Sequence, residues 1–169
     1  MGLDHVNTAP AAELLPALLA CCDVPRWAEA ILAGRPYADP ADVTATADRA
    51  ARAFTPEEVD RALAAHPRIG ERAEGAHAEA AWSRQEQAGV ATTTDVQEAL
   101  AAGNRAYEER FGRVFLICAT GLGADEVLAN LRTRLEHDSE TEAGVVADEL
   151  RKIALLRLDR VLSSEEQPA

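Results

Sequence analysis

The 169-residue sequence has few aromatic residues and few cations, and each shortage excludes a class of protein. Aromatic residues make up only 4% of the chain, so a core must be built mostly from Leu, Val, Ile and Ala, and abundant Ala favours helices. Lys and Arg number 17 against 29 Asp and Glu, which gives a formal net charge of -12. This charge argues against a nucleic-acid-binding protein, because such a protein needs a basic surface to neutralise phosphates.

Cysteines and long apolar runs are also scarce. The three cysteines, Cys21, Cys22 and Cys118, form no CxxC pair, and their odd number argues against a disulfide framework. A reducing cytosol is therefore expected. No stretch approaches the roughly 18 apolar residues that cross a bilayer, and no leader-like N-terminus or Ser-Lys-Leu C-terminus is present. We expect a soluble, cytoplasmic protein with no membrane partner.

Hydrophobic residues nevertheless make up 47% of the chain, enough for one folded domain over residues 1–169, with flexible tails at the first few residues and at 164–169. Apolar periodicity and helix-end signals predict helices at about 9–22, 25–34, 40–53, 55–66, 78–88, 94–111, 124–137 and 140–163. The apolar run 113–119 fits either a buried strand or the inside of a helix. Because no second strand-like run could pair with it, we expect an all-α, compact bundle of about eight helices.

One helix start is marked strongly. Thr55 offers an N-cap, Pro56 suits the first helical position, and Glu58 completes a capping box. The same helix must end near His66, because Pro67 disfavours the helical conformation in the residue before it.

The final helix carries a cation within an apolar stripe. A capping box at Ser139–Glu142 opens this helix, and at 100° per residue Arg157 falls on the same side as four apolar residues. These residues are Val146, Leu150, Ile153 and Val161. The guanidinium must therefore extend to the surface, pair with a carboxylate or bind an anionic ligand.

Two further positions could carry chemistry. His66 lies where a helix meets a loop and titrates near neutrality, although a histidine there could simply interact favourably with the helix dipole. Glu86 shares a helix face with Trp82 and Ser83, and Gln87 follows it. These groups could form a hydrogen-bonding wall for a polar ring, or they could be a solvated helix face.

The other histidines are weaker candidates. His5 lies in the N-terminal tail, His77 in a charged loop and His137 at a helix end, and no spacing supports a metal site. A dyad of Cys118 and His66 is conceivable, but Cys118 lies in an apolar run and fits a core residue better.

Taken together, several segments resemble the 2-oxo-4-hydroxy-4-carboxy-5-ureidoimidazoline (OHCU) decarboxylases. The segments are Ala65–Glu71, with its His-Pro-x-(Ile/Leu)-Gly pattern, Trp82–Gly89, Asn104–Gly112 followed by Phe115–Ala119, Glu149–Ile153 with Leu156–Leu158, and the early Trp27 and Arg35-Pro36-Tyr37. Leu122 departs from the pattern, because bacterial relatives often carry a basic residue there.

The resemblance implies an all-helical fold, often a homodimer, and no metal or organic cofactor. It implies that the chain decarboxylates OHCU to (S)-allantoin and CO2 in urate degradation, with His66 as the acid/base and with Glu86 and Arg157 as its catalytic partners. The implied substrate contacts are Pro67, Ser83, Arg84, Gln85, Glu86, Gln87, Phe115, Leu116, Ile117, Cys118, Ala119 and Arg157.

Two alternatives fit the same sequence. One is a cofactor-free lyase that acts on a related ureide. The other is a non-catalytic helical interaction module. This alternative predicts an exposed apolar patch and a binding function that is insensitive to substitution of His66.

Overall fold

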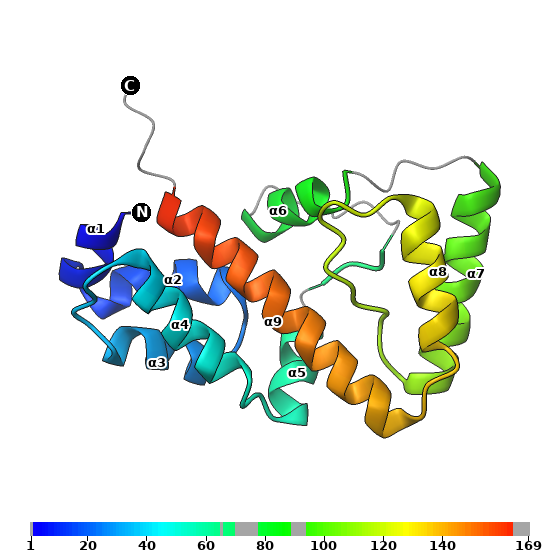
Figure 1. Cartoon of the computed structure of the whole chain (residues 1–169), viewed down its shortest axis with the longest axis horizontal. Helices are drawn as coiled ribbons and strands as arrows, with labels where there is room; N and C mark the ends of the chain where they lie inside the picture. Colours follow the sequence, from blue (N-terminus) through cyan, green and yellow to red (C-terminus); the bar gives the residue numbers. More distant parts are fainter. Residues whose placement is uncertain (1, 65, 70–77, 89–93, 164–169) are drawn as a thin grey trace. The chain divides into compact units, whose positions relative to one another are not determined.

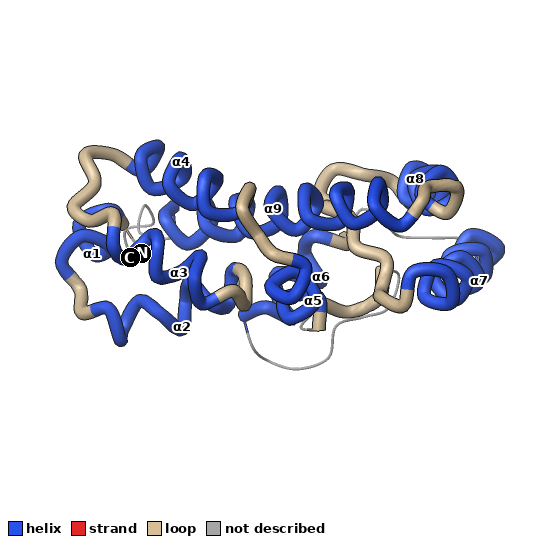
Figure 2. Tube along the Cα trace, turned by 90° about the horizontal axis from the view of Figure 1, so that it is seen from below, coloured by secondary structure: helices blue, strands red, loops and turns tan. Residues whose placement is uncertain are grey.

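The structure is a computed structural model that describes residues 2–64, 66–69, 78–88 and 94–163. Within these ranges every regular element is an α-helix, as predicted (Figure 2). The helices are α1 (Leu3–Thr8), α2 (Ala11–Cys21), α3 (Pro25–Ala33), α4 (Pro40–Ala51), α5 (Pro56–Leu63), α6 (Ala78–Glu86), α7 (Thr94–Phe111), α8 (Ala124–Arg134) and α9 (Ser139–Ser163). In this described part, no helix combines the length and the apolarity that a membrane span requires.

Helix α1 lies where the sequence predicted a flexible tail, so that expectation is wrong for Leu3–Thr8. Side chains distant in the sequence hold it in place. The Nη1 atom of Arg35 donates to the carbonyl oxygens of Ala9 at 2.8 Å and Val6 at 3.3 Å. Asn7 exchanges two hydrogen bonds with the backbone of Tyr37, at 2.8 and 3.0 Å.

The helix caps confirm one prediction and correct another. At α5, the backbone N–H of Glu58 donates to Thr55 Oγ1 at 3.3 Å, and that of Thr55 donates to Glu58 Oε2 at 2.8 Å, which is the predicted capping box. At α9 the predicted box at Ser139–Glu142 is wrong. Asp138 caps the helix instead, since its Oδ1 accepts a hydrogen bond from the backbone N–H of Thr141 at 2.7 Å.

The chain divides into two compact units, residues 1–62 with 151–169 and residues 63–150. Each unit is described by itself. In the first, α3 packs against both α2 and α4 (Figure 1). The buried Trp27 links two of these helices, because its indole N–H donates to the Ala47 carbonyl at 3.0 Å. Apolar side chains from five helices surround a void of about 10 Å³, namely Val6, Leu14, Leu18, Ile31, Leu32, Val43, Leu158, Val161 and Leu162.

In the second unit α7 and α8 lie side by side (Figure 1). Gly112 ends α7 with a positive φ of 68°, a conformation that favours glycine, and its N–H donates to the Glu108 carbonyl at 2.8 Å. The segment 113–119 then runs as irregular chain, so the expectation that it joins no sheet is confirmed for the described residues. The core consists of Ile69, Leu100, Tyr107, Phe115, Ile117, Ala119, Val127, Leu128 and Leu131.

Candidate active site

His66 lies in a short loop directly after α5. The helix ends at Leu63, slightly before the predicted end, and the backbone N–H of His66 donates to the Leu63 carbonyl at 2.9 Å. The imidazole Nε2 atom is buried, and both His66 and Pro67 are half-buried. The sequence prediction that Pro67 ends the helix and leaves His66 in a loop is therefore confirmed.

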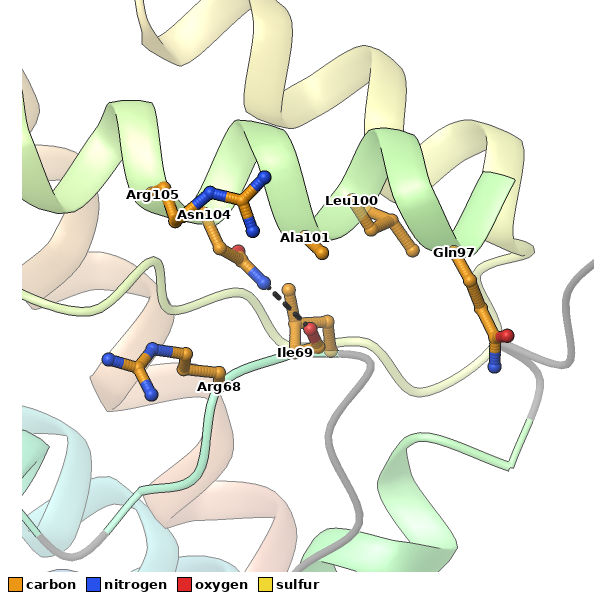
Figure 3. A pocket seen from close by; sticks show the side chains of 7 residues that line it. All are labelled: Arg68, Ile69, Gln97, Leu100, Ala101, Asn104 and Arg105. Carbon is orange, nitrogen blue, oxygen red and sulfur yellow. Dashed lines mark hydrogen bonds between the residues drawn. The ribbon is translucent and has the colours of Figure 1, made fainter. Parts of the chain in front are cut away.

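The two residues that follow Pro67 fasten this loop to α7. The carboxamide Nδ2 of Asn104 donates to the Ile69 carbonyl at 2.9 Å, as Figure 3 shows. The guanidinium of Arg68 binds the carboxylate of Glu108 through two hydrogen bonds, one from Nη2 to Oε2 at 2.9 Å and one from Nε to Oε1. No local sequence pattern marks Asn104 or Glu108 for these contacts.

Helix α6 presents two of the predicted polar groups to the protein interior. Ser83 is 3% exposed and Glu86 is 7% exposed, so the interpretation of this face as solvated is wrong. The other predicted contacts on or beside α6 differ, because Arg84 and Gln87 are half-buried whereas Gln85 is exposed.

Residues 115–119, which are predicted to contact the substrate, lie in the irregular segment 113–119. Phe115, Leu116, Ile117 and Ala119 are buried, whereas Cys118 is half-buried and the prediction of a core thiol is wrong. Side chains hold the backbone of this segment. Arg134 Nη1 donates to the Leu116 carbonyl at 2.7 Å, and the N–H of Cys118 donates to Glu149 Oε2 at 2.8 Å. These bonds replace the pairing that a neighbouring strand would provide.

A buried polar cluster surrounds Glu142, at the start of α9. Arg134 donates to Glu142 Oε1 from Nη2 at 2.6 Å and from Nε at 2.9 Å, and the hydroxyl of Tyr107 donates to the same oxygen. The Nδ1 atom of His137 lies 2.8 Å from Glu142 Oε2. Arg134 also stacks over the Phe115 ring, at 4.6 Å from its centroid.

The electrostatics of this cluster favour an ionised Glu142. Burial raises the pKa of Glu142, but the hydrogen bonds from Arg134 and Tyr107 outweigh that effect, so its pKa lies below its ordinary value of 4.5. Burial and the bond to Glu142 raise the pKa of Tyr107 and keep its hydroxyl protonated. No sequence signal marked this cluster, because Tyr107 lies 35 residues before Glu142, and Arg134 and His137 precede the start of α9.

Arg157 belongs to the first unit, whereas His66, Ser83, Glu86 and residues 115–119 belong to the second. It is 3% exposed, so extension of its guanidinium to the surface is excluded. The four apolar residues predicted to share its side of α9 are buried too. Within the first unit, burial raises the pKa of Cys22 to about 12, although the positive charge of Arg157 acts in the opposite direction. That thiol is therefore protonated at neutral pH and a poor nucleophile.

A cavity of about 450 Å³ in the second unit is lined by Arg68, Ile69, Gln97, Leu100, Ala101, Asn104 and Arg105 (Figure 3), and neither His66 nor Glu86 is among these lining residues. Among the described residues, no group of three or more His, Cys, Asp or Glu side chains could hold a metal ion.

The described part of the chain exposes no large hydrophobic side chain, so the apolar patch that an interaction module predicts is not found in it.

Comparison with known proteins identifies relatives over most of the chain. The OHCU decarboxylase family model matches residues 7–159. The 2-oxo-4-hydroxy-4-carboxy-5-ureidoimidazoline decarboxylase of Haloferax volcanii is 32% identical over 144 residues, which cover 83% of each chain. The decarboxylase of the same name from Amia calva is 30% identical over 142 residues, covering 82% of this chain and 81% of the relative.

Solved structures agree with the sequence comparison. An OHCU decarboxylase crystallised in the presence of (S)-allantoin matches with a TM-score of 0.73 and 26% identity, covering 86% of this chain and 96% of that one. A crystal structure of (S)-allantoin synthase, at 21% identity and a TM-score of 0.69, shares the fold. Because the family model covers most of the chain and relatives of 30% identity or more match over about four fifths of their length, the chain belongs to the OHCU decarboxylase family.

Proposed function

We propose that this chain decarboxylates 2-oxo-4-hydroxy-4-carboxy-5-ureidoimidazoline to (S)-allantoin and CO2 during urate degradation. The observation that carries the proposal is the identity of 32% with a relative of that name over 83% of both chains. The matching crystal structure obtained in the presence of (S)-allantoin supports the nature of the product.

The chemistry of the substrate explains why protein side chains can suffice. When the bond to CO2 breaks, its electron pair remains on the ring carbon that carries the hydroxyl. The adjacent C=N bond accepts these electrons and the ring becomes an ene-ol. The ring nitrogen that received the electrons takes up one proton. A second proton binds the carbon that carries the ureido group, and the hydroxyl loses its proton to give the carbonyl of allantoin. The enzyme must orient the ring, stabilise the developing charge and deliver one proton to one face.

We assign proton transfer to His66, because an imidazole changes its protonation state near neutral pH. Its half-buried position, with Nε2 turned away from solvent, supports this role. A positioned acid/base contributes roughly 10²- to 10⁴-fold in rate.

Glu86 and Arg157 are assigned to substrate binding. A buried carboxylate can orient the hydroxyl or ureido group, and a guanidinium can neutralise carboxylate or carbonyl charge through two parallel hydrogen bonds. The burial of Glu86 and Arg157 supports these roles, because a charge shielded from solvent interacts more strongly with a bound ligand. Further contacts are assigned to Pro67, Ser83, Arg84, Gln85, Gln87 and residues 115–119.

Three expectations stay predictions. The resemblance implies the absence of a cofactor and a homodimer, and the three cysteines favour a cytoplasmic location. Sedimentation velocity would test the homodimer, which should have twice the mass of the chain.

The test uses the handedness of the product, since OHCU also decays spontaneously to racemic allantoin. Fresh OHCU is incubated with the wild-type chain, without protein, and with a His66→Asn variant, and circular dichroism follows the allantoin formed. We expect (S)-allantoin from the wild type and a turnover at least about 100-fold lower from the variant. A His5→Asn variant is the matched control and should retain activity.

Each contrary result has its own meaning. Racemic allantoin with and without wild-type protein would contradict the proposed activity, and related ureides would then be screened. (S)-allantoin formed at a near-normal rate by His66→Asn would leave the activity in place but remove His66 from the mechanism.

A further inference from the structure

Asn104 is a buried polar residue in the middle of α7 with a bond to the loop that carries His66. Its side chain is deep in the second unit, since the residue is only 4% exposed. Its Nδ2 atom donates to the Ile69 carbonyl at 2.9 Å, across 35 residues of sequence (Figure 3). This bond lies three residues from His66 and is shielded from water, so solvent cannot easily replace it.

The short chain between the two positions can transmit this constraint to the imidazole. Pro67 follows His66 directly, and its ring fixes one backbone dihedral near −65°. At the other end, the Ile69 side chain packs in the core with Leu100 and Tyr107. The loop therefore has little freedom once the Ile69 carbonyl is fixed, and the position of that carbonyl constrains the backbone of His66.

A second anchor one helical turn along α7 provides a comparison. Glu108 is four residues after Asn104, so the two side chains share a face of the helix. Glu108 binds Arg68, but that ion pair is exposed to solvent, and exposed pairs contribute little to stability. Of the two anchors, the buried hydrogen bond from Asn104 is the one expected to hold the loop.

We propose that Asn104 is a positioning residue for His66. Asn104 holds the Ile69 carbonyl and thereby fixes where the imidazole of His66 delivers its proton. The effect on turnover rests on the proposed function, whereas the effect on the imidazole itself does not.

The experiment replaces Asn104 with leucine, which has a similar shape but no hydrogen-bond donor. With OHCU as substrate, Asn104→Leu should lower kcat about 10- to 100-fold, because a displacement of about 1 Å can cost that much, while KM stays within about twofold. In ¹H–¹³C NMR spectra of histidine-labelled protein without substrate, the Cε1–H resonance of His66 should shift and those of His5 and His137 should not. The resonance is identified by its absence from His66→Asn.

Two control variants separate positioning from stability. Val127→Ala removes buried volume from the same core on α8, so it should lower the thermal midpoint without moving the His66 resonance or changing kcat. Glu108→Gln weakens the exposed anchor and should change kcat by less than about twofold. If Asn104→Leu does not fold, Asn104→Ala, which cannot clash, undergoes the same measurements.

The outcomes are distinct. An unmoved His66 resonance in the folded Asn104 variants would overturn the proposal, whatever happens to kcat. So would a Val127→Ala variant that shifts this resonance as strongly as Asn104→Leu. A shifted resonance in a chain whose wild type does not act on OHCU would support the positioning role and contradict the proposed function.

Discussion

Arg157 shows how far a single residue can be interpreted from its place in a helix. It is buried among apolar residues of α9, which leaves an ion pair or an anionic ligand as the role of its guanidinium. Lysine at this position would keep the charge but lose the planar fork that binds a carboxylate through two parallel hydrogen bonds. We predict that Arg157→Lys lowers kcat/KM at least about tenfold while the protein stays folded.

The matched control for this change is Arg160→Lys, one turn along the same helix and only half-buried. Steady-state kinetics with OHCU should show little change in that variant. Unchanged kinetics in Arg157→Lys, with a lower thermal midpoint, would instead indicate a purely structural ion pair.

Residue-level prediction succeeded where local periodicity decides burial. The 3.6-residue repeat placed Arg157 inside the apolar stripe of its helix, and the structure buries it there. Asn104 and Arg134 carried no such signal, because each looks like an ordinary polar residue on an amphipathic helix. Each is buried and donates a hydrogen bond to a distant backbone carbonyl, that of Ile69 or Leu116, and no sequence spacing could reveal these contacts.

At the scale of elements, the buried Glu142 cluster joins three helices of the second unit. Tyr107 comes from α7, Arg134 from α8 and Glu142 from α9, and Glu142 is 1% exposed. Glu142→Gln would leave the Arg134 charge buried without its counter-charge. We predict that it lowers the free energy of unfolding by about 3–5 kcal/mol, measured by urea denaturation at pH 7. Glu140→Gln, at an exposed site in the same turn, should change it by less than about 0.5 kcal/mol.

The same variant should alter the pH dependence of stability. Because folding lowers the pKa of Glu142 below 4.5, its ionised form stabilises the protein at higher pH, and this contribution is lost as pH falls below about 4.5 through the folded-state value. Wild-type stability should therefore fall more steeply with acid than that of Glu142→Gln. Parallel curves for the two proteins would show that Glu142 does not titrate differently in the folded and unfolded states.

Elements were predictable where their ends carry local chemistry. The Thr55 capping box gave the start of α5, and Pro67 gave the limit of its end. Helix α1 was missed because it is only six residues long and its N-cap, Gly2, offers no side-chain hydrogen bond. Arg35 and Asn7 stabilise it through contacts about 30 residues apart in the sequence, and such contacts leave no periodic pattern.

At the scale of the whole molecule, the chain and the proposed substrate both carry negative charge. A formal charge of -12 repels a carboxylate at long range, so binding must rely on local cations, and Arg157 is the cation proposed for this role. Added salt screens the long-range field, because the Debye length falls from about 30 Å at 0.01 M to about 8 Å at 0.15 M. A buried cation is screened much less than an exposed one.

We therefore predict that kcat/KM for OHCU rises, roughly twofold, as sodium chloride is increased from 0.01 to 0.15 M. The spontaneous decay of OHCU is measured at each concentration and subtracted, so that the change reports the protein alone. A positively charged site that dominated the approach of the substrate would give the opposite result, a kcat/KM that falls with salt. Since salt weakens attraction and repulsion alike, the sign of the slope reports whether the net acidic surface or the local cations control the encounter.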